Sequence, residues 1–285
     1  MKILITGSNG MLGYDLIKVL KDDYEVIPTT SKTLDITDEK QVMEYISDKK
    51  PDIVINSAAY TNVDGCEENQ KLAYAVNAQG VKNLALACRK TDACLVHIST
   101  DYVFDGSATQ PIPENSKKGP ISVYGKSKLK GEEAIIETLD KYFIIRTAWL
   151  YGINGGNFPK TMLELAKNHS EITVVYDEIG SPTYTHDLAL AISELINTNY
   201  YGIYHLTNSG NCSWCEFAKY IFKIADVNVK VIPVTAKEFA RPAPRPNYSV
   251  LENKNWTEHN FKPLRNYKKA IKEYIERIKW IKEEY

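Results

Sequence analysis

The chain has 285 residues, with 35 basic and 36 acidic side chains and a formal net charge of −1. This length is sufficient for a substantial core and for two lobes. Because the charges nearly cancel, no global field attracts nucleic acid or an anionic membrane. The first apolar run is too short for a signal peptide, and no later run approaches membrane-spanning length. We therefore expect a soluble, cytoplasmic protein without nucleic-acid or membrane partners, whose five cysteines are reduced.

The first twenty residues have the pattern of a strand, a glycine turn and a helix. An apolar strand over 2–6 runs directly into Gly7, Gly10 and Gly13, and an apolar helical pattern follows. Glycines there let the backbone turn tightly and approach a pyrophosphate, which the N-terminus of the helix attracts. The spacing is GxxGxxG, whereas most dinucleotide enzymes have GxGxxG. The pattern predicts a dinucleotide phosphate site; the alternative is a glycine-rich turn without a ligand.

The segment after the second predicted strand, 25–28, bears on the choice of cofactor. An enzyme strict for NAD usually has an acidic residue there, to bind the adenosine ribose. This chain instead has Thr30, Ser31 and Lys32, which can meet a 2′-phosphate. We therefore expect NADPH, with NADH also accepted. The alternative is that Lys32 is only a solvated loop cation.

Further strand and helix patterns alternate through the first half of the chain. Strands are predicted at 52–56, 94–98 and 142–147, and Asp38 is the predicted N-cap of one intervening helix. A long helix over 68–89 includes Asn77, which is predicted as a cofactor-binding residue; it can hold neighbouring backbone, take part in a proton relay, or do both. The alternation predicts an α/β protein with a doubly wound, Rossmann-like parallel sheet. We expect a dinucleotide-binding domain over 1–151, which also receives parts of 173–202.

The remainder, 152–285, is predicted to form a smaller C-terminal substrate-binding lobe. Thr185 is the predicted N-cap of a helix, and Ser213 with Glu216 forms a predicted capping box for another. Shorter elements are predicted with less regular spacing, namely helices at 158–166 and 216–224 and strands at 172–176, 202–206 and 229–232.

Two features near the C-terminus concern the substrate and the partners. A proline-rich loop over 241–246 carries Arg241 and Arg245, which either bind a substrate diphosphate or brace the loop; we favour Arg245 for the diphosphate. The last helix has an apolar stripe that serves as core or as a subunit contact, so the protein is expected to be a monomer or a homodimer. The stripe consists of Tyr267, Ile271, Tyr274, Ile278 and Ile281.

Tyr124 and Lys128 stand four residues apart at the start of a helical pattern. At this spacing they share one helix face, about 6 Å apart along the axis. An ammonium beside a phenol favours the phenolate, so we expect Lys128 to lower the pKa of Tyr124. Such a pair is a candidate general acid or base. The alternative is an ordinary surface pair on an amphipathic helix.

In order along the chain, the glycine motif, Asn77, Ser99-Thr100 and the Tyr124/Lys128 pair resemble the extended short-chain dehydrogenase/reductase superfamily. The segments 99–106, 157–158, 180–185 and 212–214 are similar to the dTDP-4-dehydrorhamnose reductases, and the resemblance covers nearly the whole chain. It implies reduction of the 4-keto group of dTDP-4-dehydro-6-deoxy-L-mannose to dTDP-L-rhamnose, with hydride from NADPH or NADH and the proton from Tyr124.

The resemblance also implies roles for individual residues. The implied catalytic residues are Thr100, Tyr124 and Lys128. The implied cofactor contacts are Gly10, Met11, Leu12, Asp35, Ile36, Ala59, Tyr60 and Thr61. The residues implied to face the substrate are Thr100, Asp101, Tyr102 and Trp149. Some members hold magnesium between subunits with glutamates, but only Asp15 matches here, so no metal is predicted.

Alternative functions remain at this point. Another nucleotide-sugar reductase of the same fold would fit the same motifs, because the sequence does not fix the sugar or the nucleotide base. An epimerase of the same fold uses the same Tyr–Lys pair and keeps its cofactor bound. A 4,6-dehydratase is disfavoured, because Tyr102 stands where that class has a glutamate. A non-catalytic, dinucleotide-binding regulatory subunit is disfavoured by the presence of Thr100, Tyr124 and Lys128 together.

Overall fold

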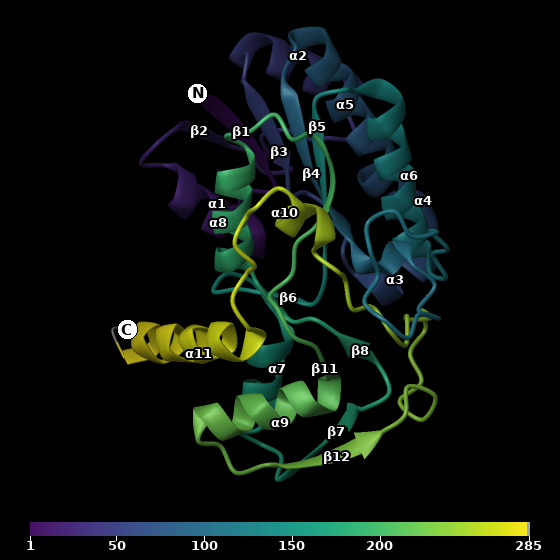
Figure 1. The fold of residues 1–285 in the computed structure, drawn as a ribbon, viewed down its shortest axis with the longest axis vertical. Coiled ribbons are helices and arrows are strands. Elements are labelled where there is room, and N and C mark those ends of the chain that lie inside the picture. The colour runs from purple at the N-terminus through teal and green to yellow at the C-terminus, as the bar shows by residue number, and fades with distance from the viewer. Residues whose placement is uncertain (284–285) are drawn as a thin grey trace.

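A computed structural model describes the backbone of residues 1–283 and the side chains of 1–279, arranged as a larger and a smaller lobe (Figure 1). The larger lobe contains a six-stranded sheet in the order β10-β5-β4-β3-β1-β2, in which every pairing is parallel. The doubly wound parallel sheet predicted from the sequence is therefore confirmed. Its strands are β1 (Lys2–Thr6), β2 (Glu25–Pro28), β3 (Ile53–Asn56), β4 (Cys94–Thr100), β5 (Tyr142–Thr147) and β10 (Gly202–His205).

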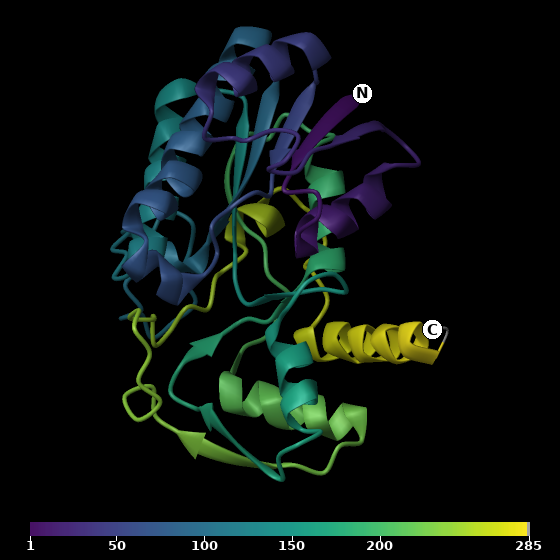
Figure 2. The same cartoon turned by 180° about the vertical axis from the view of Figure 1, so that it is seen from behind.

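Helices cover both faces of this sheet. Figure 1 shows helices on each side of the sheet, and Figure 2 shows the same arrangement from behind. Ile3 and Ile5 of β1 pack on the face covered by α1 (Met11–Leu20) and α8 (Thr185–Leu195). Leu4 points to the other face, covered by α2 (Glu39–Lys49), α5 (Gly80–Thr91) and α6 (Val123–Thr138). Burial on both faces explains why the strands are almost continuously apolar.

The smaller lobe is built from short strand pairs and three helices, α7 (Phe158–Leu165), α9 (Trp214–Ala225) and α11 (Tyr267–Glu283). Tyr267, Ile271 and Tyr274 of the predicted α11 stripe are buried in its core and Ile278 packs against them, while Ile281 lies outside the described side chains. The pairs are β7 (Glu171–Val175) with β12 (Lys230–Val234), β8 (Ile179–Gly180) with β11 (Cys212–Ser213), and β6 (Leu150–Tyr151) with β9 (Thr183–Tyr184).

The chain beyond residue 151 returns to the larger lobe. Helix α8 packs against α1, and β10 pairs with β5 as the sixth strand of the sheet. Helix α10 (Lys254–Glu258) lies beside β10 and inserts Trp256 into the same core. The division of roles between 1–151 and 152–285 stays a prediction.

Local signals identified some helix boundaries and missed others. The predicted cap at Asp38 and the capping box of Ser213 and Glu216 are confirmed. The predicted cap at Thr185 is wrong: α8 has Tyr184 as N-cap, and the Thr185 hydroxyl is held by Asp15 and by the carbonyl of Tyr151.

The helix predicted over 68–89 is also not continuous. Helix α4 (Gln70–Tyr74) and α5 are joined by a π-helical turn, Ala75–Gln79. This turn carries Asn77, whose amide is held by the backbone of Tyr60 on both sides. Between residues 1 and 283, none of the helices is long and apolar enough to cross a bilayer.

Candidate functional site

The glycine turn after β1 forms a cradle for an anion. Gly7 has φ +65°, and a Cβ there would lie 2.7 Å from the amide nitrogen of Ala58. Gly10 is the N-cap of α1, and it provides no side-chain cap. The first turn of α1 also carries no acidic residue, so the N–H groups of Met11 and Leu12 remain available to a phosphate. A Cβ on Gly13 would lie 2.4 Å from the Gly7 carbonyl oxygen, so Gly13 allows the helix to pack on the turn.

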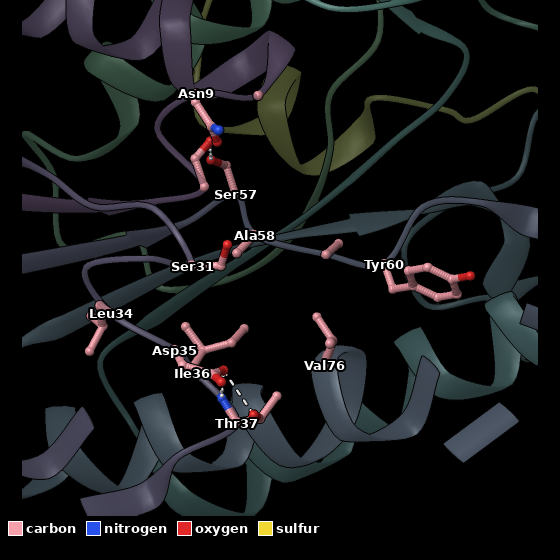
Figure 3. Close-up of a pocket in the computed structure, with 13 residues that line it drawn as sticks. Asn9, Ser31, Leu34, Asp35, Ile36, Thr37, Ser57, Ala58, Tyr60 and Val76 are labelled. Carbon is pink, nitrogen blue, oxygen red and sulfur yellow. Dashed lines mark hydrogen bonds between the residues drawn. The ribbon is translucent and has the colours of Figure 1, made fainter. Parts of the chain in front are cut away.

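A cavity of about 320 Å³ extends from this cradle across the carboxyl ends of β1 and β2 (Figure 3). Gly7, Gly10, Asp35, Ile36, Ala59 and Tyr60, all predicted cofactor contacts, line it together with Ser31 and Ser57. The Asp35 carboxylate accepts hydrogen bonds from the amide and the hydroxyl of Thr37, at 2.9 and 2.8 Å. Ala58 and Ala59 also line it, and their small side chains leave space for a ring.

A second cavity of about 480 Å³ adjoins the first, since Gly10, Ser57 and Ala59 line both. The structure therefore brings the glycine cradle and the predicted catalytic residues into one trench. The predicted site residues that line the second cavity are Gly10, Met11, Leu12, Ala59, Thr61, Thr100, Asp101, Tyr102, Tyr124, Lys128 and Trp149.

Tyr124 lies at the beginning of α6, which Ser122 caps through its hydroxyl. Thr100, the last residue of β4, is close enough to the phenol to lower the pKa of Tyr124. The Thr100 hydroxyl donates to Oδ1 of Asp101 at 2.9 Å. A strand end and a helix start thus bring the side chains of Thr100, Asp101 and Tyr124 to one cavity.

Burial raises the pKa of Tyr124 above its usual range, and the charge of Asp101 acts in the same direction. Burial also raises the pKa of Asp101, to about 6, so that its carboxylate is ionised at neutral pH. The phenol is therefore protonated at neutral pH, as a proton donor must be.

Lys128 is buried on the same face of α6. Its ammonium donates to the carbonyl of Ile98 at 2.6 Å and lies 3.2 Å from Nε2 of His97. Burial lowers the pKa of Lys128 to about 8, against the opposing effect of Glu132. The prediction that Lys128 lowers the pKa of Tyr124 is wrong for this structure, because burial dominates at the phenol and the lysine is bound by β4.

A buried ion pair holds the three elements of the site together. Arg146 of β5 donates from Nη2 to Glu132 of α6 at 2.7 Å, and both side chains are almost completely buried. Glu132 also accepts from the Ser99 hydroxyl of β4 at 2.5 Å. Removing one partner would leave a buried charge unpaired, so this pair fixes the spacing of β4, α6 and β5.

Four predicted site residues do not line either cavity: Gly13, Lys32, Asn77 and Arg245. Lys32 is exposed next to Ser31. Asn77 is buried behind the wall and supports it, since its amide bonds to the backbone of Tyr60 and to Ser127 at 3.1 Å. A structural role for Asn77 therefore fits better than direct contact with a cofactor.

Arg245 is occupied by a carboxylate in this structure. Its guanidinium binds Asp64 of α3 (Val63–Glu68) through two hydrogen bonds, at 3.0 and 2.8 Å. This contact braces the proline-rich loop against the larger lobe. A substrate diphosphate would have to displace Asp64 to bind Arg245.

Trp214 and Thr147 are among the residues that line the second cavity and that the sequence interpretation did not assign to the site. Trp214 stacks on Trp149 with ring centroids 3.4 Å apart, and Trp149 has a positive φ of 48°. The hydroxyl of Thr147 is buried and has no hydrogen-bond partner among the described residues. Thr147 ends β5, so the rule that parallel strands direct their carboxyl ends to one edge would have indicated it.

The position that matches one of the family's magnesium-binding glutamates, Asp15, is a hydrogen-bonded carboxylate. Asp15 is buried, which raises its pKa, and it accepts a hydrogen bond from Thr185. Within the described part of the chain, no group of three or more His, Cys, Asp or Glu side chains is arranged to hold a metal ion.

Comparisons with known proteins identify the family of this chain. The family model described as "RmlD substrate binding domain" matches residues 1–280. The protein SpsK of Bacillus subtilis, described as a spore coat polysaccharide biosynthesis protein, is 45% identical over 96% of this chain and 97% of its own.

Two solved structures are similar along nearly their full length. A dTDP-4-dehydrorhamnose reductase from Clostridium acetobutylicum has a TM-score of 0.96 and 50% identity, covering 98% of this chain and 100% of the other. The enzyme of the same name from Bacillus anthracis, solved in complex with NADP, has a TM-score of 0.95 and 44% identity, covering 97% and 99%. The chain therefore belongs to the dTDP-4-dehydrorhamnose reductase family of NAD(P)-dependent oxidoreductases.

Proposed function

We propose that this chain reduces the 4-keto group of dTDP-4-dehydro-6-deoxy-L-mannose to give dTDP-L-rhamnose, with NADPH as the reductant and Tyr124 as the proton donor. The observation that supports the proposal is that Tyr124, Thr100 and Lys128 line one cavity, which adjoins the glycine cradle. Family membership supports the reaction class, and the identity of the sugar is part of the proposal.

The residues present fit a nicotinamide dinucleotide. The uncapped N-terminus of α1, with its free N–H groups at Met11 and Leu12, would hold the pyrophosphate. The buried hydroxyl of Thr147, for which the described residues provide no hydrogen-bond partner, would bind the nicotinamide end of the dinucleotide. Bound there, NADPH supplies the hydride.

The side chains of this site would manage the proton and the developing charge. Tyr124 is protonated at neutral pH, so it can donate to the ketone oxygen as that oxygen gains charge. Asp101 accepts a hydrogen bond from the Thr100 hydroxyl and so fixes the direction of that hydroxyl at the site. Lys128 would place a positive charge beside the trench, which stabilises an oxyanion.

The substrate end would be formed by Tyr102 and the stacked pair Trp149 and Trp214. Positive charge is close, because Arg241 and Arg245 both act on the pKa of Tyr102. Arg241 pairs with Glu178, as Arg245 pairs with Asp64. A diphosphate would bind by exchanging these carboxylates for its own oxygens.

The test is the loss of NADPH absorbance with dTDP-4-dehydro-6-deoxy-L-mannose and with its analogues of mannose and glucose configuration. Tyr124→Phe should lose roughly 10²- to 10⁴-fold in turnover and keep its affinity for NADPH. Tyr45→Phe on α2, away from both cavities, is the matched control. Near-normal turnover by Tyr124→Phe would rule out Tyr124 as the proton donor. Faster reduction of an analogue would show that the substrate carries a different sugar.

The alternative functions predict other results. Stoichiometric NAD that stays bound through purification and does not exchange would indicate an epimerase, and a bound dinucleotide without ketone-dependent oxidation would indicate a regulatory subunit. The preference for NADPH depends on Lys32, so Lys32→Ala should raise the KM for NADPH and leave that for NADH unchanged. Cytoplasmic location and a monomeric or homodimeric state remain predictions.

A further inference from the structure

The indole of Trp149, which lines the second cavity, is held between Trp214 and Gly180. Trp149 lies between β5 of the larger lobe and β6, whereas Gly180 ends β8 and Trp214 begins α9 in the smaller lobe. Gly180 and Trp214 belong to the segments 180–185 and 212–214, which resemble the reductases. The proposed reaction assigns no chemical step to either segment.

Trp214 covers one face of the Trp149 ring. The two indoles are parallel within 5°, and their centroids are 3.4 Å apart, which is van der Waals contact. Trp214 is itself fixed, because it follows the N-cap Ser213 at the start of α9 and packs on Phe158 with ring centroids 4.5 Å apart. No ligand ring can therefore enter between the two indoles.

Gly180 covers the opposite face of Trp149. A Cβ on Gly180 would lie 2.5 Å from Cε2 of the indole, 2.6 Å from Nε1 and 2.8 Å from Cζ2. In a contact at the rim, Nε1 or Cζ2 would be nearer than Cε2, so Gly180 lies above the ring plane. No backbone fits into the 3.4 Å gap to Trp214, so Gly180 occupies the other face. Trp149 therefore meets the cavity with its rim, and neither ring face is free.

The backbone of Trp149 is in the left-handed region, with φ +48°. This conformation is unfavourable for a bulky side chain, and residues held in it cluster at ligand sites. The amide of Thr183 donates to the Trp149 carbonyl at 3.2 Å and holds the backbone, while Gly180 and Trp214 hold the ring. All three contacts come from the smaller lobe.

We propose that Gly180 and Trp214 are positioning residues, which hold Trp149 so that its rim packs against the sugar of the substrate and not against the base. The inference rests on the proposed function for the identity of the substrate. Trp149 shares its cavity with Thr100 and Tyr124, which would act on the ketone of the sugar. The C–H rim of an indole suits the aliphatic carbons of a 6-deoxy sugar, whereas stacking on a flat pyrimidine needs a free ring face.

The first test separates the sugar from the nucleotide. In Trp214→Leu and Gly180→Ala, the KM for dTDP-4-dehydro-6-deoxy-L-mannose should rise at least about tenfold, while the Kd of dTDP and the KM for NADPH keep their wild-type values. Trp214→Phe keeps a ring over Trp149 and should recover most of the loss. Tyr220→Leu, on α9 and outside both cavities, is the control. An unchanged substrate KM, or an equal rise in the Kd of dTDP, would overturn the proposal.

The second test uses the ligand-free protein. Two stacked indoles couple their electronic transitions and give a couplet in far-ultraviolet circular dichroism, which the difference between wild type and Trp214→Phe should show. Gly180→Ala should weaken this couplet, because its methyl group displaces the indole. Gly119→Ala, where a Cβ meets its nearest neighbour at 3.4 Å, is the control. A couplet unchanged in Gly180→Ala would contradict the proposed clamp. This result is independent of turnover, whereas a wild type without ketone-dependent NADPH oxidation would contradict the proposed function itself.

Discussion

Replacing Lys128 by methionine should stabilise the ligand-free fold while it removes activity. Lys128 is almost completely buried, and burial lowers its pKa from 10.5 to about 8. Methionine has a similar unbranched shape and no charge, so it removes the cost of keeping an ammonium in the interior. A residue retained at such a cost is characteristic of a functional site.

The magnitude follows from the pKa. A fall from 10.5 to about 8 corresponds to about 3 kcal/mol of folding free energy lost at neutral pH. The methionine leaves the Ile98 carbonyl and the His97 ring without a partner, which costs about 1–3 kcal/mol. The net expectation is a variant about 1 kcal/mol more stable than the wild type at pH 7.

The pH dependence isolates the lysine from other changes. Between pH 8 and 10.5 the unfolded chain holds the Lys128 proton more tightly than the fold does, so wild-type stability rises with pH in this window. Between pH 7 and 10 the wild type should gain about 2–3 kcal/mol relative to Lys128→Met.

The assay is urea unfolding of the ligand-free protein at several pH values. Lys126→Met, at an exposed position of the same helix, is the control and should show no such change. The reasoning would be refuted by a stability difference between wild type and Lys128→Met that stays constant from pH 7 to 10.

Three further predictions concern the surroundings of the catalytic residues. Burial raises the pKa of Asp101 from 3.8 to about 6, so wild-type stability falls as pH rises through that window. Asp101→Asn should then be up to about 3 kcal/mol more stable in urea unfolding at pH 7, with the gap closing near pH 4, and a gap independent of pH would contradict this. A Cβ on Gly125 would lie 2.1 Å from the Tyr102 carbonyl oxygen, whereas one on Gly156 meets nothing within 4 Å. Gly125→Ala should therefore lose about 1–3 kcal/mol of stability and most turnover, and Gly156→Ala should keep its stability; equal urea midpoints would disprove the contact. Finally, Arg245→Ala should raise the substrate KM more than Asp64→Ala does, because only the guanidinium can bind the diphosphate. Equal effects of the two substitutions on the substrate KM would show that Arg245 only braces the proline-rich loop.

The fold was predictable wherever the signal is local. Strand β3 (Ile53–Asn56) is completely buried, and its apolar run predicts a strand with both faces covered. The addition of β10 to the large sheet was not predictable, because its local pattern is equally compatible with the smaller lobe. Pairing with β5 decides the location of β10, and packing on α1 decides that of α8.

The features of the candidate site also divide into those that the sequence predicts and those that depend on the tertiary structure. The sequence by itself determined the glycine cradle and the shared helix face of Tyr124 and Lys128, because both depend on the spacing of neighbouring residues. Only the tertiary structure decided their charges. Burial keeps the phenol protonated and lowers the pKa of the lysine, and the His97 ring meets Lys128 from 31 positions away in the chain. Electrostatics inside a protein depends on what surrounds a group in space, and residue spacing along the chain does not contain that information.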